Sequence, residues 1–122
     1  MRIAITLGTL RLEADLDETP TTRALHEAMP FTSRAQTWGE EVYFTTPVQA
    51  KLEKDAQQVV APGTVCFWCE GQAIALPFGR TPMSTDERPK LASRCNVLGR
   101  LAGDPRLLQS VRSGDAIRVE IA

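Results

Sequence analysis

Residues 38–44 decide the fold of this chain and read Trp38-Gly39-Glu40-Glu41-Val42-Tyr43-Phe44. Two later stretches complete the pattern, Pro77-Phe78-Gly79-Arg80-Thr81-Pro82-Met83-Ser84 and Asn96-Val97-Leu98-Gly99. Each joins glycine to aromatic or polar residues where an apolar run stops, as happens at the end of a strand. Apolar and polar residues alternate over 41–44, so we expect Val42 and Phe44 in the core and Glu41 and Tyr43 on the outer face. The three stretches predict a fold and leave the reaction open.

The composition is that of an ordinary globular protein. The chain has 122 residues, 43% of them hydrophobic and 24% charged, with a formal net charge of −1. This length predicts one domain, residues 1–122, around a single hydrophobic core. The charge balance argues against a nucleic-acid partner, which needs clustered positive charge, and against an anionic membrane surface. With no signal peptide and no apolar run near the roughly 20 residues of a spanning helix, we expect a cytoplasmic protein.

Alternating apolar residues predict strands through most of the chain. An opening hairpin turns at Gly8-Thr9, and the Gly39-Glu40 turn separates two further strands. About eight strands are expected: at 2–7, 10–16, 31–38 and 41–46, then from Pro62-Gly63 through Val65 and Phe67, and at 73–79, 95–101 and 117–121. We interpret residues 48–60 as a loop with a helical turn, and residues 80–94 as a long connection of the kind that is often functional or mobile.

Two short helices interrupt the strands. Thr19-Pro20 is an N-cap followed by proline at the first helical position, and Pro30 ends this helix. Its apolar stripe consists of Ala24, Leu25, Ala28 and Met29. Asp104-Pro105 begins the second helix, whose apolar face is Leu107, Leu108 and Val111. Eight strands suffice to close a barrel filled by side chains, with the helices covering its ends.

No residues stand at a spacing that indicates catalysis or a metal site. The motif Cys66-Phe67-Trp68-Cys69 is followed by a turn instead of the helix that lowers the thiol pKa in redox motifs. Residues three apart on a strand point to opposite faces, so we interpret these cysteines and Cys95 as small buried apolar residues. His26, the only histidine, falls outside the helical stripe and is expected in solvent. No catalytic residue, metal or cofactor is therefore predicted.

The sequence resembles the small prokaryotic cyclophilin-like proteins over nearly its whole length. The resemblance rests on the three stretches above, taken in order with Thr19-Pro20-Thr21, Pro62-Gly63 and Gly114-Asp115. It implies a mainly β fold, a closed cyclophilin-like β-barrel of about eight strands with two short capping helices. The chain departs from the family pattern at Cys66, Phe67, Cys69 and Arg80, and the family brings no settled activity.

The resemblance also implies a ligand site, because it places the outward face of residues 41–43 near the segment 78–82. The candidate ligand-binding residues are Glu41, Tyr43, Phe78, Gly79, Thr81 and Asn96. Such a cluster offers an aromatic floor and a few polar groups to a small molecule or a short peptide. Structural roles for the same residues remain open, and we interpret Trp38 and Trp68 as packing residues.

Two other functions stay open beside this binding module. Cyclophilins isomerise prolyl bonds with an arginine and a glutamine that follows a phenylalanine-methionine pair, and nothing here matches that signature. Because fold alone does not carry function, a peptidyl-prolyl isomerase with a rebuilt site is the alternative enzyme. An accessory subunit of a larger complex, docking through an exposed edge or through residues 80–94, is the third.

Overall fold

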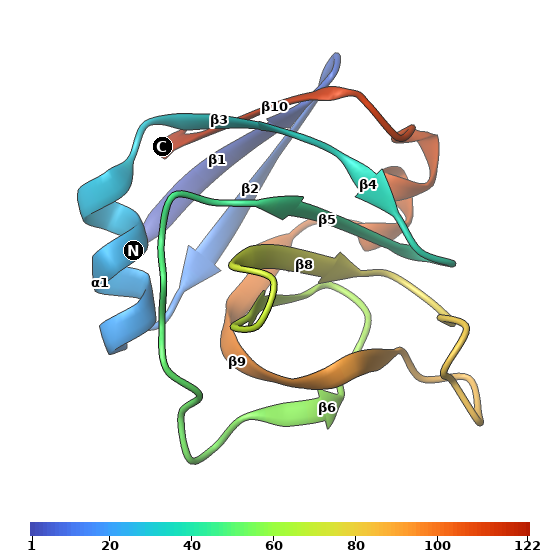
Figure 1. The fold of residues 1–122 in the computed structure, drawn as a ribbon. Helices are drawn as coiled ribbons and strands as arrows, with labels where there is room; N and C mark the ends of the chain where they lie inside the picture. The colour runs from blue at the N-terminus through green and yellow to red at the C-terminus, as the bar shows by residue number, and fades with distance from the viewer.

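The computed structural model describes residues 1–122, and antiparallel strands account for most of its regular structure (Figure 1). The ten strands are β1 Arg2–Leu7, β2 Leu10–Leu16, β3 Phe31–Arg34, β4 Gln36–Thr37, β5 Glu41–Thr45, β6 Gln57–Val59, β7 Thr64–Trp68, β8 Ala73–Pro77, β9 Lys90–Ala102 and β10 Ala116–Ile121. The two helices are α1, Pro20–Ala28, and the 3-10 helix η1, Pro105–Ser110.

The sheet is open, which corrects the predicted closed barrel of eight strands. Its strands follow the order β3-β10-β1-β2-β9-β7-β8-β5-β4, and β6 pairs with β9 outside this path. The predicted strand 31–38 is divided at Ala35, whose side chain is buried in the core. Residues before Ala35 pair with β10 and residues after it pair with β5, so one chain segment supplies both edges of the sheet. No ladder joins these edges to each other, because β3 and β4 are successive pieces of the same segment.

The main core confirms the alternation that the sequence predicts. Ile3, Ile5 and Leu7 from β1 point into one large apolar cluster, together with Val42 and Phe44 from β5. Burying such side chains is worth roughly 1.5–3 kcal/mol each, so the inward face of the sheet carries most of the stability.

The helices lie at opposite ends of the sheet, with α1 at the left of Figure 1 and η1 at the right. The Thr19 side chain accepts a hydrogen bond from the Thr22 N–H at 3.1 Å, and the Thr22 hydroxyl accepts one from the Thr19 N–H at 2.8 Å. This reciprocal cap explains where α1 begins. Leu25 is fully buried against the core, while His26 is exposed, as predicted. Neither helix has the length and apolarity that crossing a membrane requires.

β9 is longer than its sequence pattern indicates and builds a second layer. It begins at Lys90 rather than Cys95, which shortens the predicted 80–94 connection. Its first half pairs with β6, a strand inside the segment interpreted as a loop, and its second half pairs with β2 and β7. In Figure 1, β9 curves around the lower part of the molecule with β6 beside it. A smaller apolar cluster fills the space between this layer and the outer face of the sheet, consisting of Val60, Cys66, Ala75, Leu91 and Cys95.

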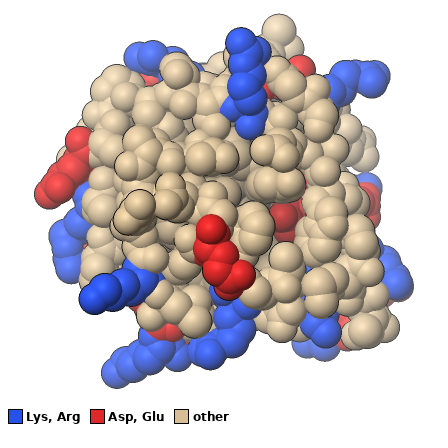
Figure 2. Space-filling view, viewed as in Figure 1, with Lys and Arg blue, Asp and Glu red and all other residues tan.

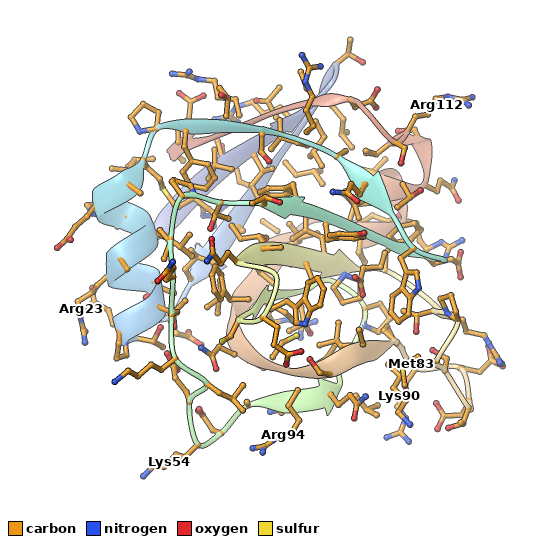
Figure 3. The ribbon with its side chains drawn as sticks, viewed as in Figure 1. Arg23, Lys54, Met83, Lys90, Arg94 and Arg112 are labelled. Carbon is orange, nitrogen blue, oxygen red and sulfur yellow. The ribbon has the colours of Figure 1, made fainter.

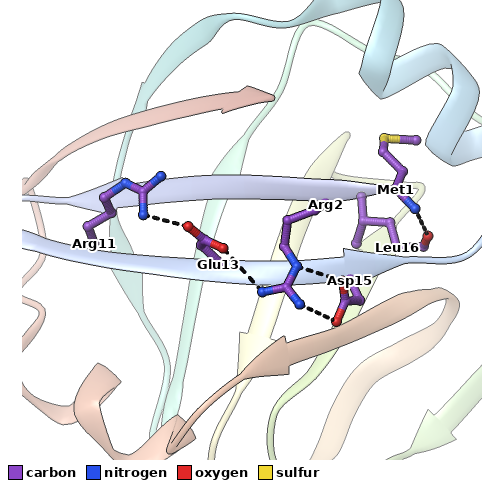
Figure 4. Close-up of polar contacts among 6 residues, drawn as sticks. All are labelled: Met1, Arg2, Arg11, Glu13, Asp15 and Leu16. Carbon is purple, nitrogen blue, oxygen red and sulfur yellow. Dashed lines mark hydrogen bonds and ion pairs between the residues drawn. The ribbon is translucent and has the colours of Figure 1, made fainter. Parts of the chain in front are cut away.

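Exposed ion pairs lie on the surface of the opening hairpin and add little to the stability of the fold. Figure 4 shows the Arg2 guanidinium reaching two carboxylates of β2, with Nε 2.7 Å from Asp15 Oδ1 and Nη1 3.1 Å from Glu13 Oε1. The side chains of Arg2 and Asp15 are 46% and 63% exposed. Pairs this exposed contribute little to stability, because solvent screens their charges.

Candidate functional site

A cavity of about 200 Å³ opens above the second apolar cluster, on the outer face of the sheet. Seven of its eight lining residues are hydrophobic, and the eighth is an acidic residue of β5. The lining consists of Trp38, Glu41, Tyr43, Trp68, Ala75, Leu91, Ala92 and Cys95.

Strand register brings these residues together. Tyr43 of β5 lies opposite Ala75 of β8, which in turn lies opposite Cys66 of β7. Side chains of paired residues lie on the same face of a sheet, so these three project away from the main core. The first half of β9 then brings Leu91 and Cys95 over this face and completes the wall.

The first two sequence stretches that decide the fold meet beside the cavity, as the family resemblance implies. The Phe78 N–H donates to the Glu40 carbonyl at 2.8 Å, and the Glu40 N–H donates to the Arg80 carbonyl at 2.8 Å. A Cβ on Gly79 would lie 2.3 Å from Glu40 Oε1, so a larger residue there would push the Glu40 side chain aside. Glu40 points away from the cavity, and its Oε2 lies 2.9 Å from Arg106 Nη1.

Glu41 is the acidic residue of the cavity. Unlike Glu40, which pairs with Arg106, it has no ion-pair partner. Its side chain is only 6% exposed, and Oε1 has no hydrogen-bond partner within the protein. No lysine or arginine lines the cavity. Burial disfavours the charged form and raises the pKa of Glu41 to about 7, from its ordinary value of 4.5. Near neutral pH this carboxyl group therefore exists in both protonation states.

Two aromatic residues of the wall are held by specific contacts. The rings of Tyr43 and Trp68 meet edge to face with centroids 6.3 Å apart, an arrangement that stabilises aromatic pairs. Tyr43 donates its hydroxyl hydrogen bond to Gln36 Oε1 at 2.9 Å. Trp68 Nε1 donates to Ser93 Oγ of β9 at 3.1 Å. The indole therefore ties β7 to the first half of β9.

Gly71→Ala is expected to displace the Trp68 indole. A Cβ at Gly71 would lie 2.3 Å from Cε3 of this ring, so the ring must move away from its contacts with Tyr43 and Ser93. We expect altered tryptophan fluorescence and near-UV circular dichroism, with a loss of about 1 kcal/mol in the free energy of unfolding. A Trp38→Phe variant isolates the signal of Trp68. Unchanged spectra would show that the indole does not rest on Gly71.

All three cysteines are free thiols, and two of them lie at the cavity: Cys95 lines it, and Cys66 belongs to the apolar cluster beneath it. Cys66 and Cys95 are buried, which agrees with their interpretation as small apolar residues, whereas Cys69 is partly exposed. Burial raises the pKa of Cys66 well above its ordinary value and that of Cys95 to about 12. Both thiols are therefore neutral at physiological pH. No group of three or more His, Cys, Asp or Glu residues is placed to hold a metal ion.

The structure brings only part of the predicted site together. Glu41 and Tyr43 line the cavity, whereas Phe78, Gly79, Thr81 and Asn96 do not. The Phe78 ring belongs to the main core. Thr81 is buried and its hydroxyl donates to the Lys90 carbonyl, which fixes the beginning of β9.

Asn96 does not line the cavity. Its side chain links three segments of the chain through hydrogen bonds. It is fully buried, and its Oδ1 accepts a hydrogen bond from the Glu53 N–H at 2.7 Å. Its Nδ2 donates to the Lys51 carbonyl at 2.9 Å and to Thr21 Oγ1 of α1 at 3.1 Å. Asn96 thus fastens the 51–53 segment and α1 to β9.

Asn96→Ala is expected to lower the free energy of unfolding by about 2 kcal/mol, because it leaves polar partners of a buried amide unpaired. Chemical denaturation measures this loss, and hydrogen exchange should show faster exchange at the Glu53 amide. Gln58→Ala is the matched control, since that amide makes one hydrogen bond, to the Leu91 carbonyl. Equal stability of the Asn96 and Gln58 variants would contradict the joining role.

The sequence interpretation missed the two tryptophans of the wall. The sequence indicates Trp38 and Trp68 as packing residues, yet both line the cavity. Strand alternation could have placed Trp68 there, since Val65 and Phe67 point into the main core and leave residues 66 and 68 on the outer face. Nothing local in the sequence indicates that β9 covers this face.

Comparisons with known proteins agree with this architecture. The model of the cyclophilin-like family matches residues 1–120. The solution structure of a hypothetical protein from Archaeoglobus fulgidus superposes with a TM-score of 0.86 and is 39% identical in sequence. That match covers 100% of this chain and 95% of the archaeal one. No protein of curated function matches significantly. The sheet topology and these matches lead to one conclusion: the chain belongs to the cyclophilin-like family.

Proposed function

We propose that the protein is a binding module that takes a small molecule, or one side chain of a short peptide, into the cavity beside Glu41. The unpartnered Oε1 of Glu41 is the observation that supports this proposal. Leaving a buried polar atom without a hydrogen bond costs about 1–3 kcal/mol, so proteins seldom keep one without a reason. A ligand that donates a hydrogen bond to this atom would remove the cost.

The size of the cavity limits the ligand. A dry cavity of about 150 Å³ holds benzene in another protein, so about 200 Å³ accommodates a group of that size or slightly larger. Apolar walls with one polar group are the usual composition of small-ligand sites. The aromatic and aliphatic lining would supply affinity, and Glu41 would orient the bound group.

The isomerase alternative has less support from the same geometry. Polarising a prolyl amide requires a donor such as arginine near the bound peptide, and no arginine lines this cavity. Arg80 lies 3.5 Å from Glu87, and Arg94 donates toward the Ala56 carbonyl. Catalysis of a proline-limited refolding reaction, abolished by Arg80→Ala, would favour the isomerase over the binding module.

Ligand binding can be tested by nuclear magnetic resonance with a fragment library of benzene-sized cationic, neutral and anionic compounds. The two tryptophan side-chain N–H signals report directly on the cavity wall. Ala92→Phe blocks the site, because Ala92 is an exposed residue of its lining and can accept a larger side chain. Ala61→Phe adds the same ring at an exposed position outside the cavity.

Fragments that shift both indole signals in the wild type and in Ala61→Phe, and not in Ala92→Phe, would support the proposal. A library without any such fragment would contradict it. Binding that survives Ala92→Phe would place the ligand elsewhere on the molecule.

A further inference from the structure

We infer that the cavity selects small organic cations, and specifically an alkylammonium group whose N–H donates to Glu41 Oε1. This inference rests on the proposed function, since it requires the cavity to be a ligand site. It adds the chemical class of the ligand, which follows from the charge, the aromatic lining and the missing partner of Glu41.

Glu41 is a buried acid with no positive charge beside it. A buried carboxylate is stable only when it is paired and hydrogen-bonded. The side chains that could pair with Glu41 lie elsewhere: Arg106 lies against Glu40, while Arg94 and Lys90 extend outward from the molecule (Figure 3). While Glu41 is ionised, the positive charge that balances it must therefore arrive with a ligand.

The wall around Glu41 is mainly aromatic and aliphatic. Trp38, Tyr43 and Trp68 all line the cavity with Glu41. Aromatic rings attract organic cations, with the largest effect at tryptophan and in sites shielded from water. Aliphatic surface at Leu91 and Ala75 would contact the alkyl part of such a ligand.

The same features disfavour other classes of ligand. An anion would meet the Glu41 carboxylate without any lining cation to offset the repulsion. A metal ion would find one carboxylate where calcium needs about six to eight oxygen ligands. Figure 2 shows the face over β5, β8 and β9 to be mainly uncharged, with the lysine and arginine side chains toward its margin. A small cation therefore meets no nearby positive charge on this face.

Protonation of Glu41 should control binding. The cation requires the ionised carboxylate, and burial raises the pKa of Glu41 to about 7. The other titratable groups facing it are Cys66 of β7 and Cys95 of β9, both neutral thiols at that pH, and the Tyr43 hydroxyl, which is bonded to Gln36. Affinity should thus fall about tenfold from about pH 8 to about pH 6, where Glu41 takes up a proton.

The test compares three probes of similar size: n-butylammonium, n-butanol and n-butyrate. Each is titrated into the wild type, Glu41→Gln and Ala92→Phe, with the indole N–H signals as readout. We expect n-butylammonium to bind the wild type at least about tenfold more tightly than n-butanol, with no binding of n-butyrate. Glu41→Gln should remove the advantage of the cation and its pH dependence, and Ala92→Phe should abolish binding.

The outcomes separate the two proposals. Equal binding of n-butanol and n-butylammonium that Ala92→Phe abolishes would overturn the cation inference and leave the ligand site standing. Binding of n-butylammonium unaffected by Ala92→Phe would overturn the inference by placing the cation outside the cavity. If no probe of the three binds and the fragment library also yields nothing at the indoles, both proposals are wrong.

Discussion

Gly99→Ala is expected to lower the free energy of unfolding by at least about 3 kcal/mol, because this position of β9 has no room for a side chain. Gly99 lies between Leu16 of β2 and Val65 of β7 in the sheet. A Cβ there would lie 2.0 Å from the carbonyl oxygen of Asp15 and 2.8 Å from the Cα of Leu16. Both atoms belong to backbone, so the strands themselves would have to separate.

Chemical denaturation of the two proteins measures this difference. Gly103→Ala is the control, because a Cβ at Gly103 meets no atom within 4 Å, although the φ of +91° there strains any side chain. That strain alone should cost about 1 kcal/mol. A loss at Gly99 no larger than the loss at Gly103 would show that β2 and β9 tolerate a wider separation than the structure indicates.

The second large effect is a fall in stability with rising pH that depends on Glu41. Its pKa is 4.5 in an ordinary setting and about 7 in the folded protein, so the folded state holds a proton that the unfolded chain has already released. Below about pH 4.5 both states are protonated and Glu41 costs nothing. Between about pH 4.5 and 7 Glu41 ionises in the unfolded chain while it stays protonated in the folded protein, so the free energy of unfolding falls as the pH rises. Above that range the protein is less stable by about 3 kcal/mol.

Glu41→Gln isolates this contribution, because glutamine has nearly the same shape and no charge. The free energies of unfolding of wild type and variant should differ by a constant amount below about pH 4.5. Above about pH 7 the variant should gain about 3 kcal/mol relative to the wild type. Denaturant titrations across this range measure the difference, in which the titration of all other groups cancels. A difference that does not change with pH would mean that Glu41 is ionised and solvated in the folded protein.

Local patterns were sufficient for most of the secondary structure. Period-two alternation located β1, β2, β5 and β10, and the Thr19-Pro20 pair located the beginning of α1. These features depend on neighbours within a few residues, which the sequence displays directly. Patterns of this kind failed for β6, because its polar residues Gln57 and Gln58 form a strand only through their pairing with β9.

The candidate site was accessible from the sequence only in part, for the same reason. Glu41 and Tyr43 alternate with core residues of their own strand, so their outward direction followed from the pattern. That Glu41 is buried did not follow, since its cover comes from residues about fifty positions later in the chain. The grouping of Phe78 and Asn96 with the site failed because chain segments can lie close together and still point their side chains to different sides.

By itself, the sequence determined the positions of the alternating strands and of α1, and its family resemblance implied that residues 41–43 lie near residues 78–82. Only the tertiary structure decided that the sheet stays open, that β9 folds back over its outer face, and that Trp38 and Trp68 join Glu41 in one cavity. The physical reason is how far apart in the sequence the interacting residues lie. Alternation and capping are energies of adjacent residues, whereas burial and the raised pKa of Glu41 arise from contacts between strands that are distant in the chain.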